Sequence, residues 1–122
     1  MIQLILHLIG DYLTQTDWMA KNKRKAWEPA WAHAFIYSVP FLLIGSERSF
    51  FVIVFHFLID RYGLARYVVF CKNWITNPGL KWADCSATGY HKDDPAWLTV
   101  WLLILADNTL HLTINFLALK YL

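Results

Sequence analysis

The sequence predicts an all-α protein, a four-helix transmembrane bundle in one domain over residues 1–122, and three observations lead to this fold class. First, 57% of the residues are apolar and only 16% are charged, whereas a soluble domain usually carries about 25% charged residues. Second, the apolar residues gather into four segments, namely Ile2–Thr16, Ala30–Ile44, Phe50 to about Phe70 and Ala96–Leu119. Third, these segments are apolar on all sides rather than along one stripe, which is typical of buried or lipid-facing helices.

The first two segments are short for membrane spans. Ile2–Thr16 is interrupted by His7 and Asp11 and lacks the basic leader region and small-residue cleavage site of a signal peptide. We therefore expect it to be a helix of the mature protein. Ala30–Ile44 contains Pro40, which should kink its helix because proline removes a backbone donor and crowds the preceding turn.

The third and fourth segments differ in length and polarity. The third carries Asp60 and Arg61 near its middle, whereas the fourth opens at Asp94-Pro95, a helix-capping aspartate followed by a proline suited to the first helical position. Only the fourth segment has the roughly 20-residue length of an unambiguous transmembrane helix, because in the third segment charged residues follow after ten apolar ones. A soluble bundle with an unusually apolar core is therefore the alternative to the membrane bundle.

The basic residues predict an orientation for the membrane bundle. They crowd the first connection, at residues 21–25, and the third, at residues 71–95, but are nearly absent from the second. Under the positive-inside rule these two connections face the cytoplasm and both termini lie outside. The expected location is the bacterial inner membrane, with lipid as a partner. The net charge of +2 is too small to predict nucleic-acid binding. Cys71 and Cys85 have no redox or zinc-finger spacing and are interpreted as free thiols.

Three histidines lie four residues from an aspartate inside the apolar segments. The pairs are His7 with Asp11, His56 with Asp60, and Asp107 with His111. Residues four apart share one face of a helix, so each pair can present an imidazole and a carboxylate to one target. Ionisable groups in apolar surroundings are costly unless they are compensated, and a bound metal ion compensates them well.

The order of residues within the pairs predicts a single site. Alternate helices run in opposite directions, and the last pair reads Asp then His where the others read His then Asp. All three aspartates are therefore expected one turn closer to the cytoplasm than their histidines, and His33 falls near the same level. Imidazole and carboxylate suit zinc, and also manganese or iron. Seven candidate ligands allow one or two ions, or some carboxylates that only orient histidines. Those candidates are His7, Asp11, His33, His56, Asp60, Asp107 and His111.

Several of these residues carry a family resemblance. His7-Leu-Ile-Gly-Asp11, the stretch from Gln15 to Lys23, His33, and His56-Phe-Leu-Ile-Asp60-Arg61 resemble a small bacterial and phage membrane-protein family of unknown function. The repeated pairs are more distantly similar to membrane-bound metal-dependent hydrolases and to the zinc-dependent phospholipase C and single-strand nuclease superfamily. That wider resemblance implies phosphoester hydrolysis at a helical zinc site. The chain is much shorter than the secreted zinc enzymes and lacks their N-terminal tryptophan ligand.

We therefore expect an integral-membrane, metal-dependent hydrolase of a phosphoester, which could be lipid-linked, at the cytoplasmic face. Asp11 or Asp60 would act as the base, and Arg61 would hold the phosphate, because a guanidinium matches phosphate bidentately. One alternative is a transporter or ion relay that oligomerises, since buried Asp and His also line ion pathways. Another is a phage-type interaction protein that binds a host protein, in which the polar layer only fixes helix packing.

Overall fold

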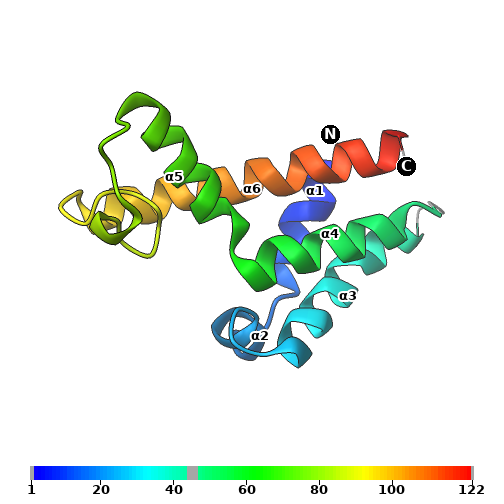
Figure 1. The fold of residues 1–122 in the computed structure, drawn as a ribbon. Coiled ribbons are helices and arrows are strands. Elements are labelled where there is room, and N and C mark those ends of the chain that lie inside the picture. The colour runs from blue at the N-terminus through cyan, green and yellow to red at the C-terminus, as the bar shows by residue number, and fades with distance from the viewer. Residues whose placement is uncertain (1, 44–46, 122) are drawn as a thin grey trace. The chain divides into compact units, whose positions relative to one another are not determined.

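The computed structural model describes residues 2–43 and 47–121, and in that part of the chain it is all-helical, as predicted (Figure 1). A π-helical turn, Ile9–Leu13, continues α1, and a short 3₁₀ turn, Trp82–Asp84, follows α5. The α-helices are α1 (Ile2–Leu8), α2 (Asp17–Asn22), α3 (Trp27–Leu43), α4 (Ser49–Tyr62), α5 (Leu64–Thr76) and α6 (Ala96–Tyr121).

The helix boundaries correct the prediction of four helices, because the described residues form six. The predicted third segment is divided at Gly63, which adopts a left-handed conformation with φ 59° between α4 and α5 and does so without the steric cost of a side chain. The predicted first segment ends at Leu13 rather than Thr16. Thr16 instead caps α2, since its side chain accepts a hydrogen bond from the backbone N–H of Met19 at 3.3 Å.

Helix length also bears on the predicted membrane bundle. Among the described residues only α6, with 26 residues and a mean hydropathy of 1.5, is long and apolar enough to cross a bilayer. The helices α3, α4 and α5 contain 17, 14 and 13 residues, short of the roughly 20 that a span requires. A four-helix transmembrane bundle and a multi-pass topology are therefore not supported, and one such helix is a weak indication of a membrane protein.

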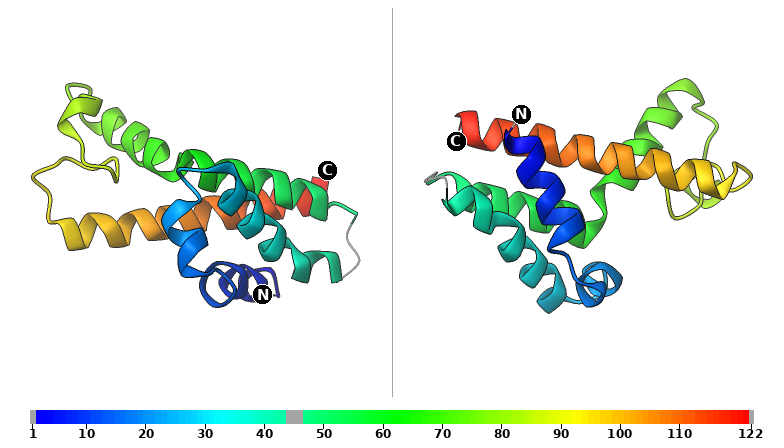
Figure 2. Two further views of the ribbon diagram at one scale, coloured as in Figure 1. Left: turned by 90° about the horizontal axis from the view of Figure 1, so that it is seen from below. Right: turned by 180° about the vertical axis from the view of Figure 1, so that it is seen from behind.

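The chain forms two compact units. The first contains Met1–Tyr62 and His111–Leu122, and the second contains Gly63–Leu110. In the first unit α3 and α4 form an antiparallel hairpin, and α1 and α2 pack against α3 (Figure 2). The C-terminal part of α6 joins this unit, where Gln3 Nε2 donates to the carbonyl of Leu112 at 2.9 Å.

The core of the first unit lies between α3 and α4. One cluster of buried side chains contains Ala30, Ala34, Ile53 and Phe57. A second contains Tyr37, Phe41, Val52 and Ala118, which brings α6 into the same core. The α3 members recur at intervals of three and four residues, so this helix buries one face. The two clusters hold the α3–α4 hairpin together on either side of its polar side chains.

The second unit is built from α5, the following loop and the N-terminal part of α6. Trp82 stacks on Tyr67 with ring centroids 5.0 Å apart, and the Lys72 ammonium donates to the Tyr90 hydroxyl at 3.1 Å. Cys71 and Cys85 both lie in this unit as free cysteines, as predicted. The histidine–aspartate cluster described next belongs to the first unit.

Candidate metal site

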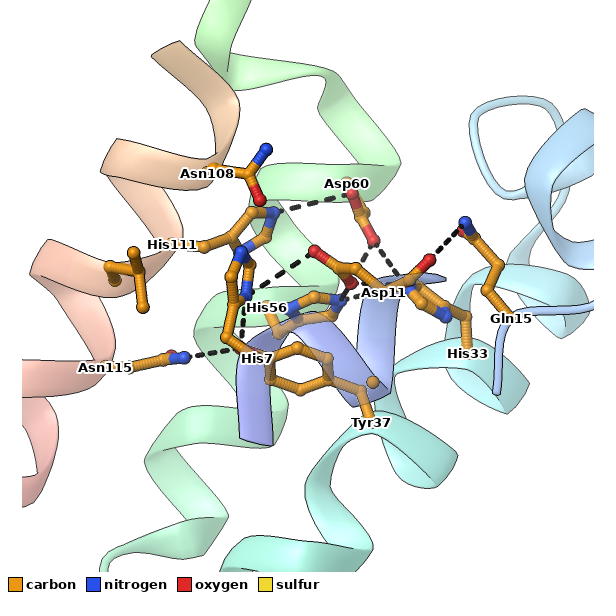
Figure 3. Close-up of polar contacts among 12 residues, drawn as sticks. His7, Asp11, Gln15, His33, Tyr37, His56, Asp60, Asn108, His111 and Asn115 are labelled. Atoms are coloured by element: carbon orange, nitrogen blue, oxygen red, sulfur yellow. Dashed lines mark hydrogen bonds and ion pairs between the residues drawn. The ribbon is translucent and has the colours of Figure 1, made fainter. Parts of the chain in front are cut away.

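Two aspartates and two histidines from three helical segments meet inside the first unit (Figure 3). Asp11 comes from the π-helical turn, His33 from α3, and His56 and Asp60 from successive turns of α4. Both histidines are fully buried, whereas Asp60 is 5% exposed and Asp11 is 9% exposed. Four ionisable groups are thus removed from water at one point, which requires strong mutual compensation.

The donor atoms of these residues face one another at short distances. Asp60 Oδ2 lies 3.0 Å from Nε2 of His33 and 3.0 Å from Nε2 of His56. Asp11 Oδ1 lies 3.2 Å and 3.5 Å from the same two nitrogens. The two Nε2 atoms are themselves 3.0 Å apart. Five separations between these four atoms therefore fall between 3.0 and 3.5 Å.

This spacing fits the ligand shell of a four-coordinate metal ion. Zinc bonds of about 2.0–2.1 Å in a regular tetrahedron place the ligand atoms about 3.3 Å from one another. The donors are imidazole nitrogens and carboxylate oxygens, a set that suits zinc and also manganese or iron. The residues present therefore fit a divalent metal ion.

In the metal-free protein the two histidines titrate differently. Burial alone would lower the pKa of His33, but its hydrogen bonds to Asp11 and Asp60 outweigh burial and raise that pKa. Burial dominates at His56 and lowers its pKa to about 4, despite the nearby Asp60. His33 is therefore the more basic of the two imidazoles, whose Nε2 atoms lie 3.0 Å apart.

The two carboxyl groups remain ionised. Burial would raise the pKa of Asp60, but the charge of His56 and hydrogen bonds from His111 and His33 hold it well below its usual range. Burial would also raise the pKa of Asp11, and the hydrogen bond from His33 together with the other histidines lowers it instead. Both aspartates are therefore in the state that binds a cation.

A lysine also reaches this cluster. Lys23 Nζ lies 2.9 Å from Asp60 Oδ2, and the lysine side chain is only 17% exposed. Lys23 follows α2 directly, and its backbone N–H bonds to the carbonyl of Met19 at 2.8 Å. Met19 is buried and anchors α2. Lys23, which follows the C-terminal end of α2, can therefore place its ammonium beside Asp60.

A second layer of polar side chains supports the ligands. The Tyr37 ring stacks on the His56 ring, with centroids 3.6 Å apart and an interplanar angle of 18°. The Tyr37 hydroxyl accepts a hydrogen bond from Asn115 Nδ2 at 2.6 Å and forms a second hydrogen bond with His7 Nδ1 at 2.8 Å. His7 Nδ1 also lies 3.5 Å from Asp11 Oδ2. Tyr37 thus links His7, Asn115 and the ligand His56.

The π-helical turn allows Asp11 to approach the ligands. A Cβ on Gly10 would lie 3.0 Å from Tyr37 Cε2 and 3.1 Å from Cγ, and still closer to Cδ2. Only glycine therefore lets this turn pack on the Tyr37 ring. The carbonyls of Gly10 and Asp11 accept side-chain hydrogen bonds from Thr14 at 2.9 Å and Gln15 at 3.0 Å. Single π-helical turns within α-helices occur frequently at functional sites.

The structure brings together six of the seven predicted ligands. His7, Asp11, His33, His56, Asp60 and His111 all lie in the first unit. His111 is fully buried, and its Nε2 lies 3.6 Å from Asp60 Oδ1. Asp107 precedes His111 by one turn of α6 but belongs to the second unit, so its role as a ligand stays a prediction.

Arg61 is held away from the cluster by other contacts. Its guanidinium donates to the carbonyl of Arg24 at 2.6 Å and lies 5.7 Å from the centre of the Trp27 ring. These contacts join the end of α4 to the connection before α3. The predicted role of Arg61 in phosphate binding stays a prediction.

The sequence prediction missed Tyr37, Asn115 and Lys23. Tyr37 lies four residues after His33, and Asn115 lies four residues after His111. The same helical spacing that singled out the histidine–aspartate pairs would have found both. Lys23 stands in a run of basic residues that predicted orientation only, and no pattern in the sequence distinguishes it from its neighbours.

The comparisons with known proteins place the chain without giving it a function. A family described as "Protein of unknown function (DUF3307)" matches residues 1–119. No curated protein and no solved structure matches the chain. These findings agree with the predicted likeness to a family of unknown function, and nothing in them supports the predicted likeness to metal-dependent hydrolases or nucleases.

Proposed function

The chain belongs to the DUF3307 family of proteins of unknown function, and we propose that it is a metal-dependent hydrolase of phosphoesters that acts at a membrane. The observation that carries the proposal is the mutual spacing of the four buried donors, with Asp60 Oδ2 3.0 Å from each histidine nitrogen. Zinc is the ion that this donor set and spacing suit best.

In this proposal Asp11, His33, His56 and Asp60 hold the metal ion. When bound, the ion would polarise a phosphoryl oxygen and lower the pKa of water. His33 gives up its proton on binding, because only the neutral imidazole is a ligand. Asp60 is the fixed anionic ligand, since both histidines and Lys23 already surround its Oδ2.

Asp11 is the best candidate for the base that accepts the proton of the attacking water. It is the most exposed of the four ligands, with 11% of its side chain accessible, so it lies on the side nearest solvent. Its second oxygen, Oδ2, lies 3.5 Å from His7 Nδ1, which is bonded to the Tyr37 hydroxyl. His7 is therefore the polar neighbour that orients the Asp11 carboxyl group when it takes up a proton.

The membrane part of the proposal is supported by apolar side chains that the first unit leaves in contact with solvent. Ile5, Leu8 and Leu13 of the first helical segment are 50%, 43% and 79% exposed, and Leu42 and Phe35 of α3 are 51% and 56% exposed. Soluble monomers rarely expose so many large apolar residues on one small unit. Together with the length of α6, this exposure favours contact with lipid. Sedimentation with membranes after carbonate washing would test it.

One observation favours a second function, a purely structural metal site. Four protein ligands fill a tetrahedral shell, and both histidines are fully buried. Structural zinc sites are closed in this way, whereas catalytic sites keep a position open for water or substrate. The protein would then be a membrane interaction protein whose metal ion stabilises its fold.

The first experiment counts metal ions in the purified protein. Elemental analysis should find about one divalent ion per chain in the wild type. Asp60→Asn and His56→Gln keep the side-chain size but remove a ligand, so both should reduce the bound metal to a small fraction. His91→Gln is the matched control, because His91 lies in the second unit, where its imidazole contacts Asp93. Full metal occupancy in Asp60→Asn would contradict the site.

A second experiment separates the two functions. The metal-loaded protein is assayed with a chromogenic phosphodiester before and after a chelator, and its thermal unfolding is followed in parallel. Hydrolysis that disappears with the metal and with Asp11→Asn supports the enzyme. A metal-loaded protein with no hydrolysis against any phosphoester, whose unfolding temperature falls strongly when the metal is removed, would establish the structural role instead.

A further inference from the structure

We propose that Lys23 forms an anion subsite beside the metal position and that the ligand it binds is a phosphate group. This inference rests on the proposed metal site and specifies which residue recognises the substrate. It is carried by the placement of the Lys23 ammonium, 2.9 Å from Asp60 Oδ2 and largely shielded from water.

The burial of Lys23 sets it apart from Lys21, which lies two residues earlier in α2. The Lys21 side chain is 70% exposed and pairs with Asp17 on the surface, whereas the Lys23 side chain is 17% exposed. Removing an ammonium from water is costly without an anionic partner. Asp60 is that partner for Lys23, so the burial of this ammonium depends on the cluster, whereas the Lys21 ammonium stays in water.

The charges of the loaded site explain what Lys23 would do. A divalent ion and the Lys23 ammonium together bring three positive charges, while Asp11 and Asp60 supply two negative ones. One positive charge is left over in a place with little water, so an anion is favoured there. Asp60 Oδ2 would also share its charge with the metal ion, which weakens its hold on Lys23.

Phosphate is the anion that this arrangement suits best. A lysine ammonium is a compact donor that binds phosphate oxygens as a point charge, and its flexible stem lets it turn from Asp60 to a ligand. The subsite lies on the accessible side of the cluster, because Lys23 and Asp11 are its most exposed charged members. Arg61 is already bonded to the Arg24 carbonyl, so Lys23 is the better-placed cation for this role.

The test measures phosphate binding to zinc-loaded protein by calorimetry, using Lys23→Met and, as matched control, Lys21→Met. Both changes remove one positive charge from the C-terminal end of α2 or the residue that follows it. The zinc content of each variant is measured first, and it should equal that of the wild type. Lys23→Met should then bind inorganic phosphate at least about tenfold more weakly, whereas Lys21→Met should match the wild type. Lys23→Arg, which keeps the charge, should retain most of the binding.

The source of the phosphate is distinguished by competition. Vesicles of phosphatidylcholine with phosphatidic acid are compared with vesicles of phosphatidylcholine alone as competitors of inorganic phosphate. Competition by the phosphatidic acid vesicles that Lys23→Met abolishes identifies a lipid headgroup, and binding of inorganic phosphate without such competition identifies a free phosphate.

Because zinc is measured before phosphate, failure of the metal site can be distinguished from failure of the phosphate subsite. Absence of zinc from the wild type would refute the metal site itself. Zinc-loaded wild type that binds no phosphate, or Lys23→Met that binds phosphate as the wild type does, would overturn the subsite while leaving the metal site intact.

Discussion

Replacing Gly10 by alanine should destabilise the first unit, although alanine is the better helix former. The added Cβ would lie 3.0 Å from Tyr37 Cε2 and closer still to Cδ2, so the ring would have to move. Tyr37 has little freedom to do so. Its ring is fully buried and stacked on His56, and its hydroxyl is bonded to His7 and Asn115.

The magnitude follows from two opposing contributions. Overpacking a core costs about 1–3 kcal/mol, and replacing glycine within a helix returns about 1 kcal/mol. Because Tyr37 is fixed on both sides, we expect a cost near the upper limit and a net loss of about 2 kcal/mol in the free energy of unfolding. The zinc affinity should fall as well, since any shift of the ring displaces His56.

The assay is urea denaturation followed by circular dichroism, with zinc affinity measured by competition against a chromogenic chelator. Gly79→Ala is the matched control, because its Cβ would meet only Asn77 Oδ1 at 3.4 Å, an ordinary contact. A Gly10→Ala variant as stable as the wild type, with unchanged zinc affinity, would refute the close approach of the π-helical turn to Tyr37.

Three further predictions address the polar layer and its protonation. Tyr37→Phe should lower the free energy of unfolding by about 1–3 kcal/mol, because His7 and Asn115 lose their shared partner; an unchanged urea midpoint would contradict this. Zinc affinity should weaken as the pH falls below neutral, since the pKa of His33 is raised and protons compete with the metal over a wider range; chelator competition at several pH values measures it. The metal-free protein should lose stability, up to about 3 kcal/mol, as the pH falls from 6.5 to about 4, because the unfolded chain protonates His56 before the folded one does. His33 acts with the opposite sign. The substitution His56→Gln removes the contribution of His56 and should therefore flatten the fall in stability, which denaturation curves at each pH would measure.

The polar cluster was more predictable than the helices that carry it. The spacing of His7 from Asp11 and of His56 from Asp60 depends only on helical periodicity, which survives local changes of boundary. Even the π-helical turn leaves the contact between His7 and Asp11 at 3.5 Å. Tyr37 could have been found in the same way, had hydroxyl groups been included with the carboxylates.

The number of helices could not be predicted, because it depends on single residues whose effect is local. Gly63 divides one apolar segment into α4 and α5 through a positive φ that the composition of the segment does not indicate. Apolar composition also does not specify whether lipid or protein covers a helix, and α3, with 17 residues, is shorter than a membrane span requires. The role of Lys23 depends on tertiary placement alone, since Lys21 lies two residues away and has the same charge.

The discontinuity of the first unit sets an order for its assembly during synthesis. All four proposed ligands lie between positions 11 and 60, and His33 and His56 are only 23 positions apart. The bond between Asn115 and Tyr37 joins positions 78 apart and can form only after α6 has been synthesised. Because nearby segments close first at lower entropic cost, we expect the nascent chain to capture its metal ion before α6 arrives to cover it. A chain interrupted after α4 would then still bind metal, but it would lack the helix that completes its core.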